Sequence, residues 1–239
     1  MVKSWVMLAA ILVIILKSSV ASADQFDPIP QQQLPEITPG LQERRIALTF
    51  DDGPTPDETS EILDILRDYN AHATFFVLGS RVEQYPEIAR REVAEGHEIA
   101  NHTYSHLLCE PGVSLTKLIN DIRKAQEVIH DTTGVRPKLF RPPHGLYNEQ
   151  LIQAIQAESL QLALWTDEMD TMDWDRPGVA YIVKRVLKNA SDGDIVLFHD
   201  HVHGKSNTMD ALRKILPELK NRGYQFVTMS ELEASSVAQ

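Results

Sequence analysis

Residues 45–54 read RIALTFDDGP, an apolar run that ends in two adjacent carboxylates. The run is typical of a buried strand, and Gly53 and Pro54 suit the turn that follows it. Such a turn requires at most one aspartate, so Asp51 and Asp52 are expected to have separate tasks. A strand followed at once by polar residues recurs along the chain, and this recurrence decides the predicted fold class.

Seven short apolar runs predict strands, and amphipathic helical patterns fill the segments between them. The predicted strands are residues 45–50, 73–79, 97–100, 138–140, 160–165, 194–198 and 224–229. The predicted helices are residues 55–69, 85–96, 114–129, 148–157, 178–190 and 208–222. Alternation of this kind predicts an α/β fold with a parallel sheet, closed into a seven-stranded barrel or wound open.

Local residue choice also predicts where three helices begin or end. Thr55 and Glu58 have the spacing of a capping box at the first helix. Ser114 is predicted to cap the long helix, and Gly96 to end the helix before it.

The first residues are predicted to be a targeting segment rather than part of the domain. Lys3 precedes an apolar run from Trp5 to Leu16, and a stretch of small residues ends at Ala23. These features are typical of a cleavable signal peptide at residues 1–23, which predicts a secreted or periplasmic protein. The run is short for a membrane span, and an uncleaved anchor is the alternative.

The rest of the chain is predicted to contain an extended leader at residues 24–44, rich in Pro and Gln, and one domain at residues 45–239. The formal net charge of −11 argues against nucleic acid and against an anionic membrane surface as partners. Cys109 is the only cysteine, which excludes an intramolecular disulfide. A monomer with no stable membrane span after signal cleavage is expected.

Polar clusters come at or just after five of the predicted strands. They are TFDDGP at 49–54, NHTYSH at 101–106, RPPHG at 141–145, DTMDW at 170–174 and LFHD at 197–200. In a (β/α) barrel the carboxyl ends of the strands converge on the face that carries the active site. The five clusters are therefore expected to meet there.

Two histidines of the second cluster, His102 and His106, have the spacing of metal ligands. Four residues apart on a helical turn, both imidazoles would lie on one face, and an aspartate of the first cluster would complete a two-histidine, one-carboxylate set. Surface or capping histidines are the alternative for an isolated pair. The same ligand set also occurs in non-haem iron oxygenases, so it does not fix the reaction.

Hydrolysis at such a site also needs a general base and a general acid. The aspartate that does not bind metal is a candidate base, and Arg141 could orient it. His199 is a candidate acid, and Asp173 could pair with it and raise its pKa. A structural histidine and a surface ion pair are the alternatives for His199 and Arg141. Trp174 could stack on a sugar or pack in the core.

The five clusters, in this order, resemble the motif set of the polysaccharide deacetylases, the NodB-type domain of carbohydrate esterase family 4. The first three are similar to the family patterns TFDDG, H-[ST]-x-x-H and R-x-P-x-G, and the last two to D-x-x-D-W and L-x-H. The resemblance covers residues 46–200. It implies a distorted (β/α) barrel that hydrolyses acetyl groups, N-acetyl in preference to O-acetyl, on a polysaccharide such as peptidoglycan or a chitin-like glycan.

The resemblance also implies the ligands of the metal and the identity of the base. Asp52 would bind the metal together with His102 and His106. Asp51 would be the base, tethered by Arg141. One divalent ion is implied, with zinc expected and cobalt or nickel as alternatives.

By the same resemblance, His199 would be the acid, tuned by Asp173, and Leu197 would line the acetyl pocket. His144 and Gly145 would lie in the substrate groove, with Trp174 in its wall. Many family members have Tyr in place of His144, where the backbone N–H helps to stabilise the oxyanion, and a change of side chain leaves that donor in place.

Two other functions fit parts of the pattern. A metal-dependent amidase or imidase for a small molecule would need a capped groove, whereas the short predicted loops favour an open one. A carbohydrate-binding protein on a dead enzyme scaffold would have lost a base, ligand or acid, and none is lost here. His201 and His203 could bind a second metal or lie in a solvated loop.

Overall fold

The structure is a computed structural model that describes residues 44–236. The predicted signal peptide and all of the predicted leader except Arg44 lie outside the described residues. Within residues 44–236, no helix is both long and apolar enough to cross a membrane.

Seven parallel strands form one sheet, close to the predicted positions. They are β1 (Arg44–Asp51), β2 (Thr74–Val77), β3 (Glu98–Asn101), β4 (Leu139–Phe140), β5 (Gln161–Leu162), β6 (Asp194–His199) and β7 (Tyr224–Val227). Their order is β5-β4-β3-β2-β1-β6, and β7 also pairs with β1. The longest strand, β1, therefore has β6 along its length, β2 beside its second half and β7 beside its first half.

The sheet curls toward a barrel that closes incompletely between β5 and β6. After β5 the chain crosses to β6, where Thr166 N donates to Ile195 O at 3.0 Å and Thr171 N to Leu197 O at 3.2 Å. The strand predicted at residues 160–165 is therefore shorter than expected, because its second half leaves β4 to reach β6. The prediction of a distorted (β/α) barrel is confirmed.

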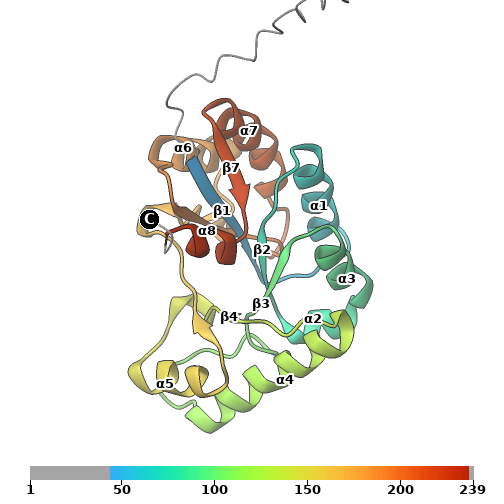
Figure 1. The fold of residues 1–239 in the computed structure, drawn as a ribbon, viewed down its shortest axis with the longest axis vertical. Helices are drawn as coiled ribbons and strands as arrows, with labels where there is room; N and C mark the ends of the chain where they lie inside the picture. Colours follow the sequence, from blue (N-terminus) through green and yellow to red (C-terminus); the bar gives the residue numbers. More distant parts are fainter. Residues whose placement is uncertain (1–43, 237–239) are drawn as a thin grey trace, which may run out of the picture. The chain divides into compact units, whose positions relative to one another are not determined.

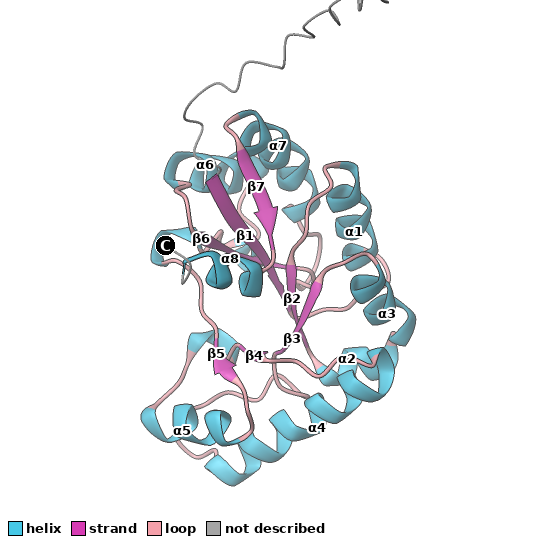
Figure 2. Cartoon of the chain, viewed as in Figure 1, coloured by secondary structure: helices cyan, strands magenta, loops and turns pink. Residues whose placement is uncertain are grey.

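Helices surround the strands, as Figure 1 and Figure 2 show. They are α1 (Glu58–Asp68), α2 (Gly79–Gln84), α3 (Pro86–Ala94), α4 (Leu115–Thr133), α5 (Glu149–Ala157), α6 (Val179–Asn189), α7 (Thr208–Asn221) and α8 (Met229–Ser236). The sequence did not predict α2 or α8. The helix α2 has six residues, and α8 begins within the segment predicted as the last strand.

The predicted capping box is wrong, whereas the Ser114 cap is confirmed by its hydrogen bond from Lys117 N at 3.3 Å. At α1, Thr55 exchanges hydrogen bonds with Thr59, whose N–H donates to Thr55 Oγ1 at 3.3 Å. The Glu58 carboxylate instead accepts from a backbone N–H that follows β6, at 3.4 Å. Thr55 and Glu58 therefore form other contacts in place of the reciprocal hydrogen bonds of a capping box.

The core contains one carboxylate with no hydrogen bond among the described residues. Glu92 on α3 is fully buried, and neither of its carboxylate oxygens has a partner within residues 44–236. Burial raises the pKa of Glu92 well above its ordinary value, and the negative charge of Asp200 raises it further. The folded protein therefore holds this carboxyl in its protonated form above the pH at which the unfolded chain releases the proton.

Glu92→Leu is expected to stabilise the protein, and the more so at higher pH. An acid whose pKa is raised on folding contributes stability that declines as pH rises above its unfolded pKa. Removing an unsatisfied buried polar group is worth about 1–3 kcal/mol in the free energy of unfolding. Urea unfolding between pH 5 and 9 measures this, with Glu87→Leu on the exposed side of α3 as the control. An equal decline with pH in wild type and Glu92→Leu would contradict the assignment.

Candidate functional site

Strand register brings the predicted site residues to one edge of the sheet. Asp51, the last residue of β1, is the Cα partner of His199, the last residue of β6. The last residues of β3 and β4 are also paired, so His102 and Arg141 leave the sheet side by side. Parallel strands that end in register thus collect residues from distant parts of the chain.

Asp52, His102 and His106 form a compact group of potential metal ligands. The Asp52 Oδ1 atom lies 3.5 Å from His102 Nε2 and 3.3 Å from His106 Nε2. The three ligand atoms lie within 4.8 Å of one another, and no other such group occurs among the residues that the structure describes. One carboxylate and two imidazoles are a donor set suited to a divalent transition metal.

The surroundings of these side chains also fit a cation. Asp52 Oδ1 is buried and has no hydrogen-bond partner within residues 44–236. His102 Nδ1 donates to the backbone oxygen of Arg141 at 2.7 Å, which leaves the lone pair of Nε2 directed at the site. Burial lowers the pKa of His106, and the opposing effect of Asp52 does not restore it. A neutral imidazole is the form that binds a metal.

The expectation that the two histidines share a helical turn is wrong. Residues 102–106 form a loop in which Thr103 and His106 have φ values of 69° and 60°. Two backbone N–H groups of this loop donate to Asp121 Oδ2 on α4, at 2.9 and 3.0 Å. The carboxylate of Asp121 fixes the conformation of the loop. Both imidazoles can therefore approach Asp52 although they are not on a helix.

Asp51 and Arg141 form a buried ion pair beside the ligand group. Their side chains are 5% and 0% exposed, and Arg141 Nη1 lies 2.7 Å from Asp51 Oδ1. The same guanidinium donates to Thr49 Oγ1 at 2.8 Å and stacks 3.9 Å from the centre of the Phe76 ring. The second oxygen of Asp51 lies 3.8 Å from His102 Nε2. Asp51 thus has one oxygen held and the other directed toward the site.

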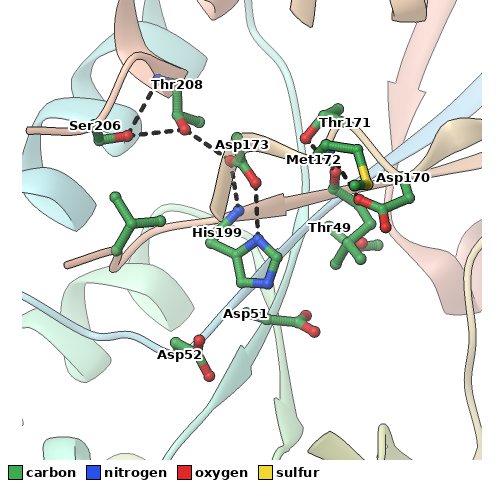
Figure 3. Close-up of polar contacts among 12 residues, drawn as sticks. Thr49, Asp51, Asp52, Asp170, Thr171, Met172, Asp173, His199, Ser206 and Thr208 are labelled. Carbon is green, nitrogen blue, oxygen red and sulfur yellow. Dashed lines mark hydrogen bonds and ion pairs between the residues drawn. The ribbon is translucent and has the colours of Figure 1, made fainter. Parts of the chain in front are cut away.

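His199 is held from behind by a chain of hydrogen bonds (Figure 3). Its Nδ1 lies 2.8 Å from Asp173 Oδ1, and its backbone N–H donates to Asp173 Oδ2 at 2.9 Å. Thr208 Oγ1 also donates to Asp173 Oδ2, at 2.7 Å, and Ser206 donates to Thr208. Figure 3 places the other ring nitrogen of His199 toward Asp51.

The pKa of His199 is raised to about 9. Burial on its own lowers this pKa, but the hydrogen bond and the charge of Asp173 outweigh burial, and Asp51 and Asp52 add to the rise. A cation bound by Asp52 would offset the last of these contributions. Near neutral pH the imidazole is therefore protonated and can donate a proton.

These side chains meet around a hollow of about 360 Å³. It is lined by Asp51, Asp52, His102, His106, His144, Trp165, Asp170, Trp174, Leu197 and His199. Of the other predicted residues, Arg141 and Asp173 are fully buried behind this lining, and Gly145 lies against Trp165. A Cβ added to Gly145 would lie 2.9 Å from the Trp165 ring, so the glycine allows this indole to pack closely.

The sequence prediction missed Trp165 and Asp170. In the sequence Trp165 stands at the end of a predicted strand, where nothing distinguishes it from a core residue. Asp170 opens the DTMDW cluster, so the signal was present in the sequence.

A family model for polysaccharide deacetylases matches residues 38–163. The chain belongs to the polysaccharide deacetylase family. The predicted membership and the prediction of an enzyme that removes acetyl groups from carbohydrates are confirmed, and the alternative of a non-catalytic binding protein is wrong. Members of the family depend on a metal ion, in keeping with the ligand group of the deacetylase.

Relatives of the deacetylase cover about four fifths of this chain. A peptidoglycan-N-acetylglucosamine deacetylase from Bacillus cereus is 47% identical over 190 residues, which are 80% of this chain and 88% of the relative. The structure of peptidoglycan deacetylase PdaC from Bacillus subtilis has a TM-score of 0.75 and 41% identity over 82% of this chain and 93% of that chain. A family 4 acetyl xylan esterase from Clostridium thermocellum, in complex with cobalt, has a TM-score of 0.73 and 36% identity over 79% of this chain and 90% of that chain.

Asp200 of the deacetylase links the two sides of the site, and the sequence prediction did not assign it a role. Its carboxylate accepts from Thr59 Oγ1 at 2.7 Å and occupies the space where a Cβ on Gly53 would lie, at 1.9 Å. Its N–H donates to the backbone oxygen of Asp51 at 3.1 Å. Burial raises its pKa to about 7, and the charge of Asp52 adds to the rise. Asp200, which directly follows His199, therefore connects the end of β6 to the end of β1 and the turn at Gly53.

The suggestion that His201 and His203 gather a second metal finds no support within residues 44–236. Their ring centres lie 6.1 Å apart, and His201 Nδ1 lies 3.7 Å from Glu58 Oε2. The potential ligand atoms of His201, His203 and Glu58 do not all lie within 4.8 Å of one another, as those of the first ligand group do.

Asp173→Asn is expected to move the alkaline limb of the pH–rate profile of the deacetylase to lower pH. A general acid loses activity as pH rises through its pKa, and loss of the Asp173 charge lowers the pKa of His199. Profiles of kcat/KM from pH 6 to 10 measure this. Asp175→Asn, an exposed neighbour, is the control and is expected to leave the limb in place. An unmoved limb in Asp173→Asn would exclude His199 as the acid.

Proposed function

We propose that the deacetylase hydrolyses N-acetyl groups of peptidoglycan, with Asp51 as the base and His199 as the acid. The observation that carries this mechanism is the register pairing of Asp51 with His199 beside the ligand group. Two titratable groups with different surroundings thus flank the place where an acetyl group would bind. Peptidoglycan is proposed because relatives such as the Bacillus cereus enzyme bear that substrate in their names.

In this mechanism the residues move two protons. Asp51 takes a proton from the water that attacks the acetyl carbonyl carbon. The carbon–nitrogen bond then breaks, and His199 donates its proton to the leaving nitrogen, so that the products are acetate and a sugar amine. Asp173 holds the imidazole in place and Arg141 holds Asp51. Trp174 and Leu197 lie in the hollow, where they can position the sugar and the acetyl methyl group.

Asp52, His102 and His106 would hold the metal, and zinc is the proposed ion. A divalent ion held by these residues would polarise the acetyl carbonyl and lower the pKa of a water molecule. The cobalt complex of the Clostridium thermocellum relative supports cobalt as an alternative.

A polymeric substrate fits the shape of the site better than a small molecule. Trp174 is 49% exposed, and Leu146 and Tyr147, which follow His144, are also exposed. A second hollow shares Asp52, His106 and Trp174 with the first, so the site continues along the surface. Peptidoglycan lies outside the cytoplasmic membrane, so this substrate also accords with the predicted signal peptide and with secretion.

Acetate release tests the proposed function. Zinc-loaded protein is expected to release acetate from peptidoglycan glycan strands faster than from acetylxylan. Chelation should abolish the release, and zinc, cobalt or nickel should each be tested for its recovery. Release from acetylxylan alone would refute the proposed substrate, and release unaffected by chelation would refute the metal-dependent mechanism.

A further inference from the structure

A second hollow of about 400 Å³ lies beside the proposed catalytic site and has no role in the mechanism above. It is lined by Asp52, Leu78, Arg81, His106, Trp174, His201, Val202 and His203. Three of these residues also line the first hollow, so a chain of sugars that fills one can extend into the other. A group bound in the second hollow would therefore belong to a sugar next to the one that loses its acetyl group.

Arg81 supplies an unpaired positive charge to this hollow. It lies on α2, is half-buried, and forms neither an ion pair nor a side-chain hydrogen bond with any residue in the range 44–236. Arg91, another partly buried arginine, is by contrast paired, at 2.7 Å from Asp64 and 2.6 Å from Glu95. A partly desolvated guanidinium without a partner is suited to bind an anion from outside the chain.

The loop after β6 adds two histidines to the hollow and carries a lysine outside its lining. His201 and His203 line the hollow, and Lys205 follows them in the sequence. The guanidinium of Arg176 lies against this loop, with Nη1 2.7 Å from the position of a Cβ on Gly204. The nearest acidic side chain of α1, Glu58, lies 3.7 Å from His201 Nδ1 and leaves His203 and Arg81 without a carboxylate partner.

We propose that Arg81, with His201 and His203, binds a carboxylate carried by a sugar next to the one that is deacetylated. The inference rests on the proposed function, and it narrows the substrate to an acidic glycan. In a chain of formal net charge −11, an anionic polymer would be repelled by most of the surface and needs a local positive site. Peptidoglycan offers carboxylates of two origins, the lactyl group of muramic acid units that carry no peptide and the acidic stem peptide of units that do.

Three forms of one glycan test the carboxylate site. They are peptide-free strands with free lactyl carboxylates, the same strands with these carboxylates converted to neutral amides, and strands that retain their stem peptides. Binding is measured by calorimetry in the Asp51→Asn background, which prevents turnover. The value of kcat/KM is measured in protein that retains Asp51. Arg81→Gln is the test variant, and Arg136→Gln, which removes one exposed charge elsewhere, is the control.

Protein with Arg81 is expected to bind acidic strands about tenfold more tightly than amidated strands. A charge-assisted hydrogen bond accounts for a difference of this size. Arg81→Gln should bring this ratio close to one, whereas Arg136→Gln should leave it unchanged. An Arg81-dependent preference that appears only with peptide-bearing strands assigns the carboxylate to the peptide and supports the site. The proposed carboxylate site would be overturned if protein with Arg81 bound acidic and amidated strands equally. It would also be overturned if Arg81→Gln left the ratio of the two affinities unchanged.

Failure of the proposed function would look different from failure of this inference. If no strand released acetate from zinc-loaded protein, the proposed function would be wrong. The binding ratios in the Asp51→Asn background would still decide whether Arg81 recognises a carboxylate.

Discussion

Asp51→Asn is expected to lower kcat/KM for acetate release by about 10²–10⁴-fold while the protein keeps its metal. The asparagine preserves the size of the side chain, but it cannot take a proton from water. The proposed metal ligands are the neighbouring Asp52 and the two histidines, so the ligand group stays complete. The measurements are kcat/KM with zinc-loaded protein and metal content by elemental analysis.

Asp52→Asn is the matched variant, one residue along the same strand end. It removes the only carboxylate of the ligand group and is expected to lower metal content and metal affinity, with loss of activity as a consequence. If both variants lost metal equally, the division of labour between the two aspartates would be wrong.

Arg141→Leu is expected to cost about 3–5 kcal/mol in the free energy of unfolding and to remove most of the activity. The substitution leaves Asp51 buried, with its 5% exposed side chain deprived of the partner at 2.7 Å. Urea unfolding at pH 7 measures the stability.

The double variant Asp51→Leu with Arg141→Leu separates the lost ion pair from lost packing. Replacing a buried pair by apolar side chains is often close to neutral in stability, so the double variant should regain much of what the single one loses. Equal stability of the single and double variants would mean that the cost comes from loss of the stacking of the guanidinium on Phe76 rather than from the unpaired charge.

The sequence alone was sufficient to predict the strands, because apolar runs bounded by polar residues report burial directly. It failed where tertiary contacts override local preference. Thr55 and Glu58 have capping-box spacing, but Thr55 pairs with Thr59 and Glu58 turns toward the loop after β6. The histidines of the second cluster have helical spacing, but hydrogen bonds to Asp121 on α4, the next helix, hold the residues between them in a loop.

The predicted site residues come together in the structure, and their roles remain predictions. Motifs identify residues that follow strand ends, which is why Asp51, His102 and His199 could be named. Trp165 and Asp200 could not, because their importance depends on what they touch. Trp165 packs against Gly145 and Asp200 against Gly53, and neither contact is visible in a linear pattern.

The pairing of β1 with the last strands also determines when the site can form during folding. β1 is the first described strand, and its Thr49 hydroxyl donates to Val196 O across 147 positions of the chain. Contacts over such separations carry a high loop-closure entropy and tend to form late. The ligand group spans only Asp52 to His106, so it can assemble from the first half of the domain. A nascent chain could therefore acquire its metal site before its proton donor, and activity would begin only once β6 has joined the sheet.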